Sequence, residues 1–433
     1  MSGAPYIDPQ ARAGLAQGST GLGHIKHLLD QGLDVSILNW ADSLSNGRED
    51  PREFIFRVAD VIGTHPSKPS VNVQTWTGLE PLYGGATQEV VGTGPTVTIR
   101  NFSVPGAAMA YGLGSLWRDS GLADERPDVL FVCHGHNLVG ASQIELVLGE
   151  LLAGLEYFRL AHPGVPIVAL VQNPAADTDA MTLAQKAWQR IASLRDVALI
   201  DGYSPYIAAG KPVDWYADAD VIHPSDTGIE AAFLPSIKRI WARSPSRPAV
   251  ALPSLLGGLD PALNLIPNGD FAEFDNAVPD GWVAETGVTA AKETAIVRNR
   301  GRGYSLKLTS TGGTAFANRI NYTLPNGEHA PLRGKPISLF GWVYKPAGAP
   351  ASLGQITLEA LAPSGNSTFA TTRAMNTQQT GAWVPWAICG LRVPDECFEI
   401  TARLHHDTAA SVASEPVYFQ DVTLVRGPLP RGL

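Results

Sequence analysis

The stretch Val35-Ser36-Ile37-Leu38-Asn39-Trp40-Ala41-Asp42-Ser43-Leu44-Ser45-Asn46-Gly47 decides how the first half of the chain is interpreted. Its apolar run from Val35 to Trp40 is typical of a parallel strand that is buried on both faces. The run ends in a small residue, an acid and a serine, and a glycine follows shortly afterwards. Because α/β proteins place reactive groups at the carboxyl ends of parallel strands, Ser43 is a candidate nucleophile. A serine near a glycine is also common in ordinary loops, so the rest of the chain has to decide.

Composition limits the classes of function. The chain has 433 residues, of which 44% are hydrophobic, so we expect two or three domains with sizeable cores. The net charge of −9 and the lack of a basic run argue against nucleic acid or an anionic membrane as the main partner. The sequence shows no segment apolar enough for membrane insertion and no signal peptide at its start, which favours an intracellular protein or one that leaves the cell in an assembled particle.

The pattern of residues 34–243 predicts strands that alternate with helices. The expected strands are 35–40, 71–76, 97–102, 129–133, 166–171 and 197–200, and the expected helices begin near residue 50 and cover 107–118, 142–161, 180–194 and 227–242. About five parallel strands with crossover helices on both faces predict a flavodoxin-like, three-layer α/β/α domain.

The flanking regions differ in character. Residues 1–33 are interpreted as an N-terminal segment, either a linker or an anchor, and residues 244–263 form a proline- and glycine-bearing linker. Residues 264–427 contain short strands separated by turns, which predicts an all-β jelly-roll sandwich. Two alternatives stay open there. Cys389 and Cys397 either form a disulfide or remain thiols, and four tryptophans (Trp282, Trp342, Trp383 and Trp386) either make a sugar-stacking surface or, as favoured for any single one, belong to the core.

Polar residues follow the other predicted strands at the edge of the sheet where Ser43 lies. Gly106 opens a loop in which a backbone amide can point at an anion. The strand ending at Cys133 is followed by Asn137, whose side-chain amide could donate to the same anion. Further along, Asp220 precedes His223 by three residues, a spacing that lets the acid hold the imidazole in one tautomer while its other nitrogen faces a serine.

These pieces resemble the SGNH, or GDSL-type, hydrolase family in order, spacing and location, over roughly residues 34–243. Residues 41–47 match the family block Gly-Asp-Ser-Leu-Ser/Thr-x-Gly, and Asn101 with Gly106 matches the block in which an Asn is followed by the oxyanion Gly. Residues 135–137 match Gly-x-Asn-Asp. Residues 220–224 match Asp-x-x-His-Pro, and Gly228 stands at the family's later glycine. Two departures matter. Ala41 replaces a glycine and would be strained at a positive φ, and Leu138 replaces an aspartate, which puts the geometry of that loop in doubt.

The resemblance implies a role for each residue. Ser43 is the nucleophile, His223 the general base and acid, and Asp220 the residue that orients the imidazole; the oxyanion hole is formed by the backbone N–H groups of Ser43 and Gly106 and the side chain of Asn137. No metal or other cofactor is expected. His134 and His136 have the spacing of metal ligands but lack a clear third ligand. Two residues are placed around the pocket: Asp42, expected to bond backbone amides in the turn, and His136, expected at the pocket mouth.

The opening of the last domain, Asn264 to Phe271, and its ending, Val417 to Leu424, are similar to those of carbohydrate-binding jelly rolls, although purely structural modules also have such openings. Together the resemblances imply a serine esterase that removes O-acyl groups, above all O-acetyl groups, from a cell-surface polysaccharide. The composition and the missing signal peptide fit a phage tail protein located in the virion tail. There it could act alone, as a homo-oligomer or together with other tail proteins. A secreted esterase is the second version. The rival is a non-catalytic glycan-binding adhesion protein on a decayed esterase fold.

Overall fold

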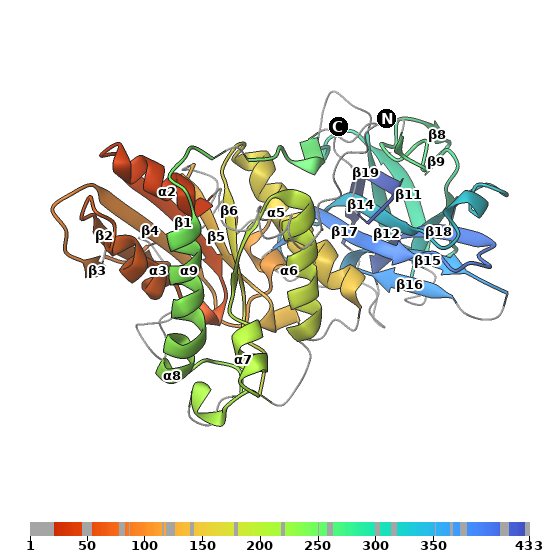
Figure 1. The fold of residues 1–433 in the computed structure, drawn as a ribbon. Coiled ribbons are helices and arrows are strands. Elements are labelled where there is room, and N and C mark those ends of the chain that lie inside the picture. The colour runs from red at the N-terminus through yellow and green to blue at the C-terminus, as the bar shows by residue number, and fades with distance from the viewer. Residues whose placement is uncertain are drawn as a thin grey trace, which may run out of the picture. The chain divides into compact units, whose positions relative to one another are not determined.

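The computed structural model folds into two compact units, drawn as ribbons in Figure 1. The first unit comprises residues 1–109, 120–144 and 159–253, and the second comprises 110–119, 145–158 and 254–433. The structure describes residues 21–45, 54–77, 83–85, 87–114, 117, 126–138, 143–176, 181–217, 221–249, 251–257, 263–298, 304–312, 318–350, 352–363, 367–372, 379–407 and 415–428.

A seven-stranded sheet forms the centre of the first unit, in the order β3-β2-β4-β1-β5-β6-β7. Every neighbouring pair is parallel except β2 with β3. The predicted parallel α/β domain is thus present, with one antiparallel edge strand that was not predicted. The strands are β1 (Val35–Ala41), β2 (Ser70–Thr75), β3 (Thr87–Val90), β4 (Thr96–Ser103), β5 (Val129–Cys133), β6 (Ile167–Val171) and β7 (Ala198–Asp201).

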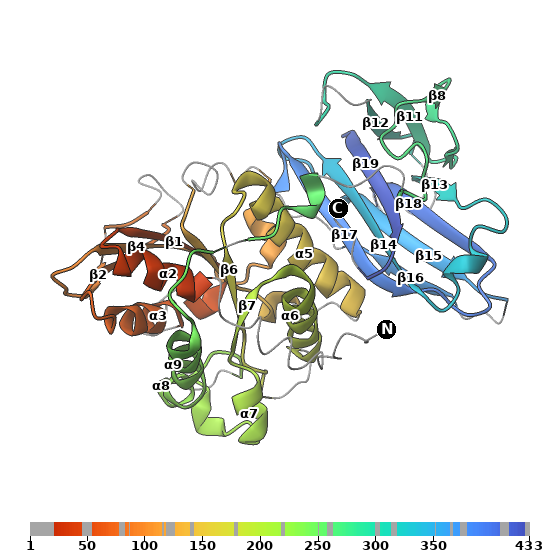
Figure 2. The ribbon, with the colours of Figure 1, turned by 45° about the horizontal axis from the view of Figure 1, so that its top comes forward.

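Helices cover this sheet because their apolar stripes match its buried faces. Helices α2 (Gly21–Asp30), α3 (Phe54–Gly63) and α9 (Leu234–Arg243) lie side by side and share one hydrophobic core with the sheet (Figures 1 and 2). The right-handed crossover from β6 to β7 places α6 (Met181–Arg195) on the opposite face. There, Trp188 Nε1 donates to the carbonyl oxygen of His134 at 2.9 Å. Short helices α7 (Ser204–Ala208) and α8 (Asp226–Gly228) and a π-helical turn (Ile229–Phe233) complete the region before α9.

Two sequence-based expectations change at this level. Leu22, Ile25 and Leu29 of α2 are buried in the core of the first unit, so residues 21–33 belong to the α/β domain and are neither a linker nor an anchor. The helix expected over 107–118 is absent from its first part, where residues 107–114 contain only a short 3₁₀ turn, Met109–Gly112, whereas Trp117 is helical. None of the described helices is long and apolar enough to cross a bilayer.

The second unit is built on two antiparallel five-stranded sheets, ordered β10-β13-β18-β15-β16 and β11-β12-β19-β14-β17, beside the small β8-β9 pair. The predicted all-β domain is therefore present. The strands are β8 (Phe274–Asp275), β9 (Val278–Pro279), β10 (Val283–Ala284), β11 (Val288–Glu293), β12 (Ser305–Ser310), β13 (Arg319–Thr323), β14 (Pro336–Tyr344), β15 (Leu353–Leu361), β16 (Thr368–Thr371), β17 (Trp383–Arg392), β18 (Glu399–Asp407) and β19 (Val417–Arg426).

This second unit also contains two segments from earlier in the chain, residues 110–119 and most of helix α5 (Ile144–Ala161). Within the unit, Gln379 Nε2 donates to the carbonyl oxygen of Ala110. The backbone N–H of Leu255 donates to Glu156 Oε2 at 2.7 Å. Tyr157 packs against Trp342 with ring centroids 5.9 Å apart. The sandwich is therefore completed by residues that precede the linker in sequence.

All three cysteines are buried thiols, so the disulfide that was one alternative for Cys389 and Cys397 does not form. Three of the four tryptophans of the sandwich (Trp282, Trp342 and Trp386) are buried, which excludes them from a sugar-stacking surface. Trp383 is half-buried and packs against Tyr344 with ring centroids 5.7 Å apart.

The segment that opens the sandwich lies against β19 at very close range. The Val422 N–H donates to the Gly269 carbonyl oxygen at 2.7 Å, and the Asn264 side chain accepts from the Leu424 N–H at 2.9 Å and donates to the Val422 carbonyl at 3.0 Å. A Cβ atom added at Gly269 would lie 1.9 Å from the Val422 carbonyl oxygen. Glycine is therefore required here by a close backbone approach.

We expect Gly269→Ala to destabilise the sandwich by about 1–3 kcal/mol, because the added methyl group forces the opening segment away from β19. Gly348→Ala is the control. Gly348 has φ +78° but open space around it, so the added methyl group should lower the free energy of unfolding by only about 1 kcal/mol, through the backbone conformation alone. Thermal and urea unfolding of both full-length variants measures the difference. Equal losses would contradict the prediction.

Candidate active site

The centre of the first sheet is where its strand order reverses. Chain connections lead from β1 to β2 and β4 on one side and then cross to β5, β6 and β7 on the other. In the register, Ala41 lies opposite both Ser103 of β4 and Cys133 of β5, so three strands end at the same level. A crevice outside the carboxyl ends of such strands is the usual ligand site of an open α/β sheet.

Ser43 and His223 meet at this point. Ser43 opens a 3₁₀ turn (Ser43–Ser45) directly after β1, and His223 lies in the loop before α8. His223 Nε2 is 2.9 Å from Ser43 Oγ, within hydrogen-bond distance, and both side chains are half-buried. Asp220, predicted to orient the imidazole, lies outside the described residues. The structure thus brings together two members of the predicted triad from positions 180 residues apart.

Hydrogen bonds to two neighbouring segments hold the loop that carries His223. From the end of β6, Asn173 Nδ2 donates to the Ile222 carbonyl and the Ala176 N–H donates to the Val221 carbonyl, both at 2.8 Å. On the other side, the Ala217 N–H donates to the His223 carbonyl at 2.9 Å. These bonds hold the backbone of the loop that carries the imidazole.

Gly228 keeps the helix behind this loop close to its neighbours. Its N–H donates to Ser225 Oγ at 3.2 Å, the N-cap of α8. A Cβ atom at Gly228 would lie 2.2 Å from Tyr206 Oη and 2.3 Å from the Trp215 carbonyl oxygen. The later glycine of the sequence motif thus has a packing reason.

Side chains of β1 and β4 fix the turn that follows Ser43. Asn101 Nδ2 donates to the Ser45 carbonyl, and Ser103 Oγ donates to the same oxygen at 3.1 Å. Asn39 Nδ2 in turn donates to Asn101 Oδ1 at 2.8 Å. Asn101 was found from its sequence motif, whereas Asn39 and Ser103 were not predicted to support the site; their polarity inside otherwise apolar strands is the signal that could have found them.

The two departures from the family pattern are accommodated. Ala41 is the last residue of β1, paired in register on both sides, so its backbone is extended and glycine is not needed. Leu138 is buried and closes a 3₁₀ turn (His136–Leu138) with its N–H donating to the Gly135 carbonyl at 3.0 Å. The loop therefore keeps an ordered conformation with an apolar side chain in place of the aspartate.

The two expected oxyanion donors beyond Ser43 flank it. Gly106 is exposed, with φ +75°, a left-handed conformation that favours glycine. The Val104 N–H, in the same loop, donates to the Ala41 carbonyl at 3.0 Å, which ties this loop to β1. Asn137 is half-buried, and its Nδ2 donates to Asp42 Oδ2 at 3.2 Å and to the Ala107 carbonyl at 3.1 Å.

Asp42 is fully buried behind the nucleophile and does not line an open pocket. It accepts from the Leu44 N–H at 3.2 Å, as expected for a turn acid, and also from two side-chain amides, those of Asn137 and Gln172. Burial raises the pKa of Asp42 to about 6, while the hydrogen bonds from Gln172 and Leu44 and the nearby His223 act in the opposite direction. Gln172 was not predicted; its polarity directly after the buried strand β6 is the signal.

The two histidines after β5 have separate surroundings. His136 is buried, with Nε2 2.7 Å from the Asn173 carbonyl oxygen, so it does not lie at the pocket mouth as predicted. His134 packs edge-on against Trp40, and burial lowers its pKa to about 3, with a backbone hydrogen bond to Ala107 acting in the opposite direction. Within the described ranges, the His, Cys, Asp and Glu side chains form no group of three or more that could bind a metal ion.

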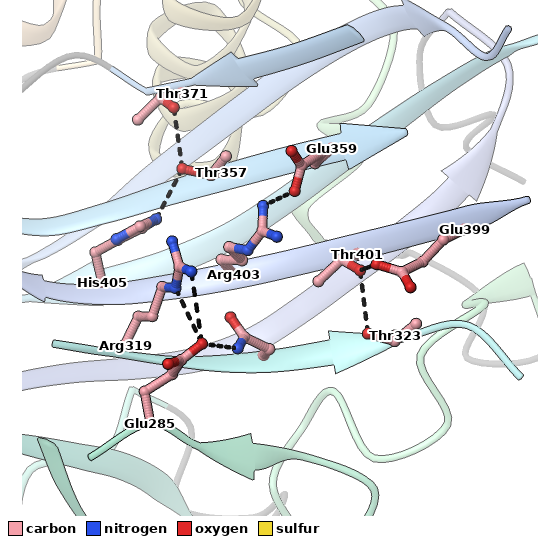
Figure 3. A network of polar contacts seen from close by, with 11 residues as sticks. Glu285, Arg319, Thr323, Thr357, Glu359, Thr371, Glu399, Thr401, Arg403 and His405 are labelled. Atoms are coloured by element: carbon pink, nitrogen blue, oxygen red, sulfur yellow. Dashed lines mark hydrogen bonds and ion pairs between the residues drawn. The ribbon is translucent and has the colours of Figure 1, made fainter. Parts of the chain in front are cut away.

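One face of the sheet β10-β13-β18-β15-β16 in the second unit carries a network of polar side chains, shown in Figure 3. Arg403 pairs with Glu359, and His405 Nε2 lies 2.8 Å from Thr357 Oγ1, which contacts Thr371 Oγ1 at 3.0 Å. At the other side of the face, Glu285 accepts from Asn321 Nδ2 at 2.8 Å and pairs with Arg319 at 3.5 Å.

The register extends this face to an apolar side chain at its edge. Glu359 lies opposite Phe369 of β16, so both side chains stand on the same face. Phe369 is 54% exposed, which is unusual for a large aromatic residue. The charged members Arg403 and Glu359 are only 17% and 18% exposed. Polar groups held in fixed positions beside an exposed ring can recognise a polyhydroxylated ligand.

Comparison with known proteins gives little further identification. No family model and no curated protein matches the chain. Among solved structures, the enzymatically active domain of tailspike protein 4 of bacteriophage CBA120 is similar at 15% identity and a TM-score of 0.28, over 39% of this chain and 22% of that chain. The CBM22-1 xylan-binding domain of Xyn10C from Paenibacillus barcinonensis has 15% identity and a TM-score of 0.28, over 37% and 93%. TmCBM61, in complex with β-1,4-galactotriose, has 14% identity and a TM-score of 0.23, over 38% and 98%. These scores are too low to identify a fold or a function.

The buried Asp42 carboxyl should make stability depend on pH. Its pKa of about 6 in the folded protein lies above its ordinary value of 3.8, so the folded state binds the proton more tightly. The free energy of unfolding therefore falls as the pH rises through this interval. Compared with Asp42→Asn, the wild type should lose on the order of 1–3 kcal/mol between pH 3.5 and 7. Urea unfolding of both proteins at several pH values measures this; parallel pH curves would sink the prediction.

Proposed function

We propose that the first unit is a serine hydrolase that cleaves carboxylic esters, with Ser43 as the nucleophile. The hydrogen-bonded pair Ser43–His223, half-buried where the strand order reverses, is the observation that carries this proposal. A serine is a weak nucleophile unless an adjacent base takes its proton, and His223 Nε2 is at the required distance. The SGNH-type pattern around the pair supports the same assignment.

The reaction would run in two halves. Ser43 Oγ attacks the ester carbonyl carbon while His223 Nε2 takes the hydroxyl proton, and the new oxyanion is held by the N–H groups of Ser43 and Gly106 and the amide of Asn137. Collapse of this intermediate breaks the C–O bond to the alcohol, which leaves with the proton from His223. Water then attacks the acyl-enzyme with His223 again as base, releasing the acid and restoring Ser43. Asp220 is assigned to orient the imidazole from its sequence spacing alone.

The substrate we propose is an O-acyl group, in particular O-acetyl, on a cell-surface polysaccharide. The support is the combination of a hydrolase site with a sandwich whose polar face suits a polyhydroxylated ligand (Figure 3). Binding a polymer on the same chain as the hydrolase site raises the local concentration of its ester groups. A position in a phage tail, alone or with other tail proteins, and a secreted esterase remain the two proposed settings.

Glycan binding by the second unit is the alternative function, and the exposed Phe369 beside the Arg403–Glu359 pair favours it. Sugar rings stack on aromatic side chains while their hydroxyl groups bond to fixed polar groups. In this version the chain is an adhesion protein, whether or not Ser43 is active. The two functions are separable, because each depends on a different unit.

Ser43→Ala should abolish hydrolysis of p-nitrophenyl acetate and labelling by a fluorophosphonate probe, because it removes the attacking oxygen. The same variant should release no acetate from acetylated surface polysaccharides that the wild type deacetylates. Ser36→Ala, at the other end of the same strand, is the control and should keep both activities. Absence of labelling in the folded wild type would sink the esterase proposal.

Phe369→Ala should weaken binding of the full-length chain to its polysaccharide about fivefold, since loss of a stacking contact costs about 1 kcal/mol. Phe398→Ala is the matched control, because Phe398 is also exposed but precedes β18 outside the polar network. Polysaccharide affinity electrophoresis in the Ser43→Ala background separates binding from turnover. Equal binding by the two variants would show that the polar face is not the glycan site.

A further inference from the structure

Strands β2 and β4 of the first unit differ from other strands of the same sheet. Strands β5 and β6 consist of apolar residues that are all buried, as expected for parallel strands covered on both faces. In β2 and the first part of β4, by contrast, apolar and polar residues alternate, as in the run Val71-Asn72-Val73-Gln74. Such alternation is typical of a strand with one face on the core and the other towards solvent.

The apolar members of this alternation belong to the core. Val71 and Val73 of β2 and Val97 and Ile99 of β4 are buried in the hydrophobic core that α3 shares with the sheet. The residues between them stand on the opposite face, because successive side chains of a strand alternate. Five half-buried residues make up this opposite face, which we call the β2–β4 face: Asn72, Gln74, Trp76, Thr98 and Arg100.

The register arranges the β2–β4 face as a band along the two strands, which lie side by side (Figure 2). Asn72 lies opposite Thr98, and Gln74 lies opposite Arg100. Both strands are parallel to β1, so the band leads towards the sheet edge at which Ser43 follows β1. The β2–β4 face is therefore continuous with the edge that carries the candidate active site.

Trp76 stands at the end of the band nearest to Ser43. Its N–H donates to the carbonyl oxygen of Asn101 at 3.0 Å, and the side chain of Asn101 donates to the carbonyl of Ser45. Its ring packs against Phe102 with centroids 4.9 Å apart. Because β1 and β2 both flank β4, the backbone of Trp76 is about 10 Å, two strand spacings, from that of β1. A sugar residue with its acyl group can span this distance.

A second aromatic residue lies beside Trp76. Tyr83 forms a backbone bridge with Trp76, and the N–H of the following Gly84 donates to the Thr75 carbonyl at 2.9 Å. Tyr83 is half-buried, and burial raises its pKa to about 12, while the nearby Arg100 acts in the opposite direction. The phenol therefore keeps its proton at neutral pH and can donate a hydrogen bond.

We propose that the β2–β4 face binds the sugar chain that carries the ester, with one sugar ring against Trp76. This inference rests on the proposed esterase function. Sugar hydroxyl groups both donate and accept hydrogen bonds, as do the amides of Asn72 and Gln74 and the hydroxyl of Thr98. One aromatic ring among such groups suits a polyhydroxylated ligand, whereas the core of a protein interface is more apolar. The hydrolase unit would thus have a glycan site of its own.

Trp76→Ala should lower a ratio of two rates: kcat/KM for an acetylated polysaccharide, divided by kcat/KM for p-nitrophenyl acetate. The ratio should fall about fivefold to tenfold, because a stacking contact is lost that the small ester does not make. The polysaccharide is the best wild-type substrate among chemically O-acetylated xylan, galactomannan and alginate. A purely structural role for Trp76 would lower both rates and leave their ratio unchanged. Trp76→Phe keeps a ring and should hold the ratio within about twofold of the wild type.

Trp241→Ala is the matched control, because Trp241 is also half-buried but lies on α9, which packs on the opposite face of the sheet. It should leave the ratio unchanged. Gln74→Ala removes one amide from the β2–β4 face and should lower the ratio about twofold to fivefold. Melting temperatures identify a variant that fails to fold, and Gln74→Ala carries the test if Trp76→Ala is that variant.

Two outcomes overturn the glycan site and leave the esterase intact. One is an unchanged ratio in the folded variants of Trp76 and Gln74. The other is a wild type that hydrolyses p-nitrophenyl acetate but none of the three acetylated polysaccharides. A folded wild type with neither turnover nor labelling of Ser43 overturns the proposed function, and the glycan site with it.

Discussion

The parallel hydrogen bonding of β4, β1 and β5 is the constraint on which the active site depends. It brings Ser103, Ala41 and Cys133 to one level, so the loops that follow these strands lie around Ser43. Side chains of β4 also fix the turn after Ser43, since Asn101 and Ser103 both donate to the carbonyl of Ser45. Ser43 is positioned by the sheet, which preserves its short distance to His223 without a strained residue at Ala41.

The side-chain amides of Asn137 and Gln172 surround one buried acid, Asp42, next to Ser43. Asp42 has no access to solvent, so its charge is stabilised only by the donors that surround it. A buried carboxylate of this kind costs stability at neutral pH. The side-chain amides of Asn137 and Gln172 donate to this acid directly beside Ser43, so a group that lowers stability lies at the candidate site.

Most of the architecture could be predicted from hydrophobic patterns and motif order. The continuous apolar runs of β1, β5 and β6 predicted buried parallel strands, and motif spacing predicted that Ser43 and His223 would meet. The burial of individual side chains was predicted less well. His136 was expected to line the pocket mouth but is buried against the Asn173 carbonyl, because a side chain in the loop after a strand can turn either way. Gln172 was not predicted, although its polarity directly after the buried strand β6 could have indicated it. Its partners Asp42, Cys133 and His136 come from the ends of β1 and β5, which are distant in sequence. The expected helix is absent from residues 107–114 because a run of small apolar residues fits several backbone conformations.

The discontinuous make-up of the second unit has a consequence for how such a protein can evolve. A sandwich that ended at its linker could be exchanged between proteins by recombination at residues 244–263. Here Gln379 is hydrogen-bonded to Ala110, and Leu255 to Glu156, so part of the second unit is encoded within the α/β half of the chain. Recombination at the linker would leave the transferred sandwich without these segments and the remaining half with unmatched apolar side chains such as Tyr157. The two halves therefore have to be inherited together, and new specificity must arise by substitution on their surfaces instead of by module exchange.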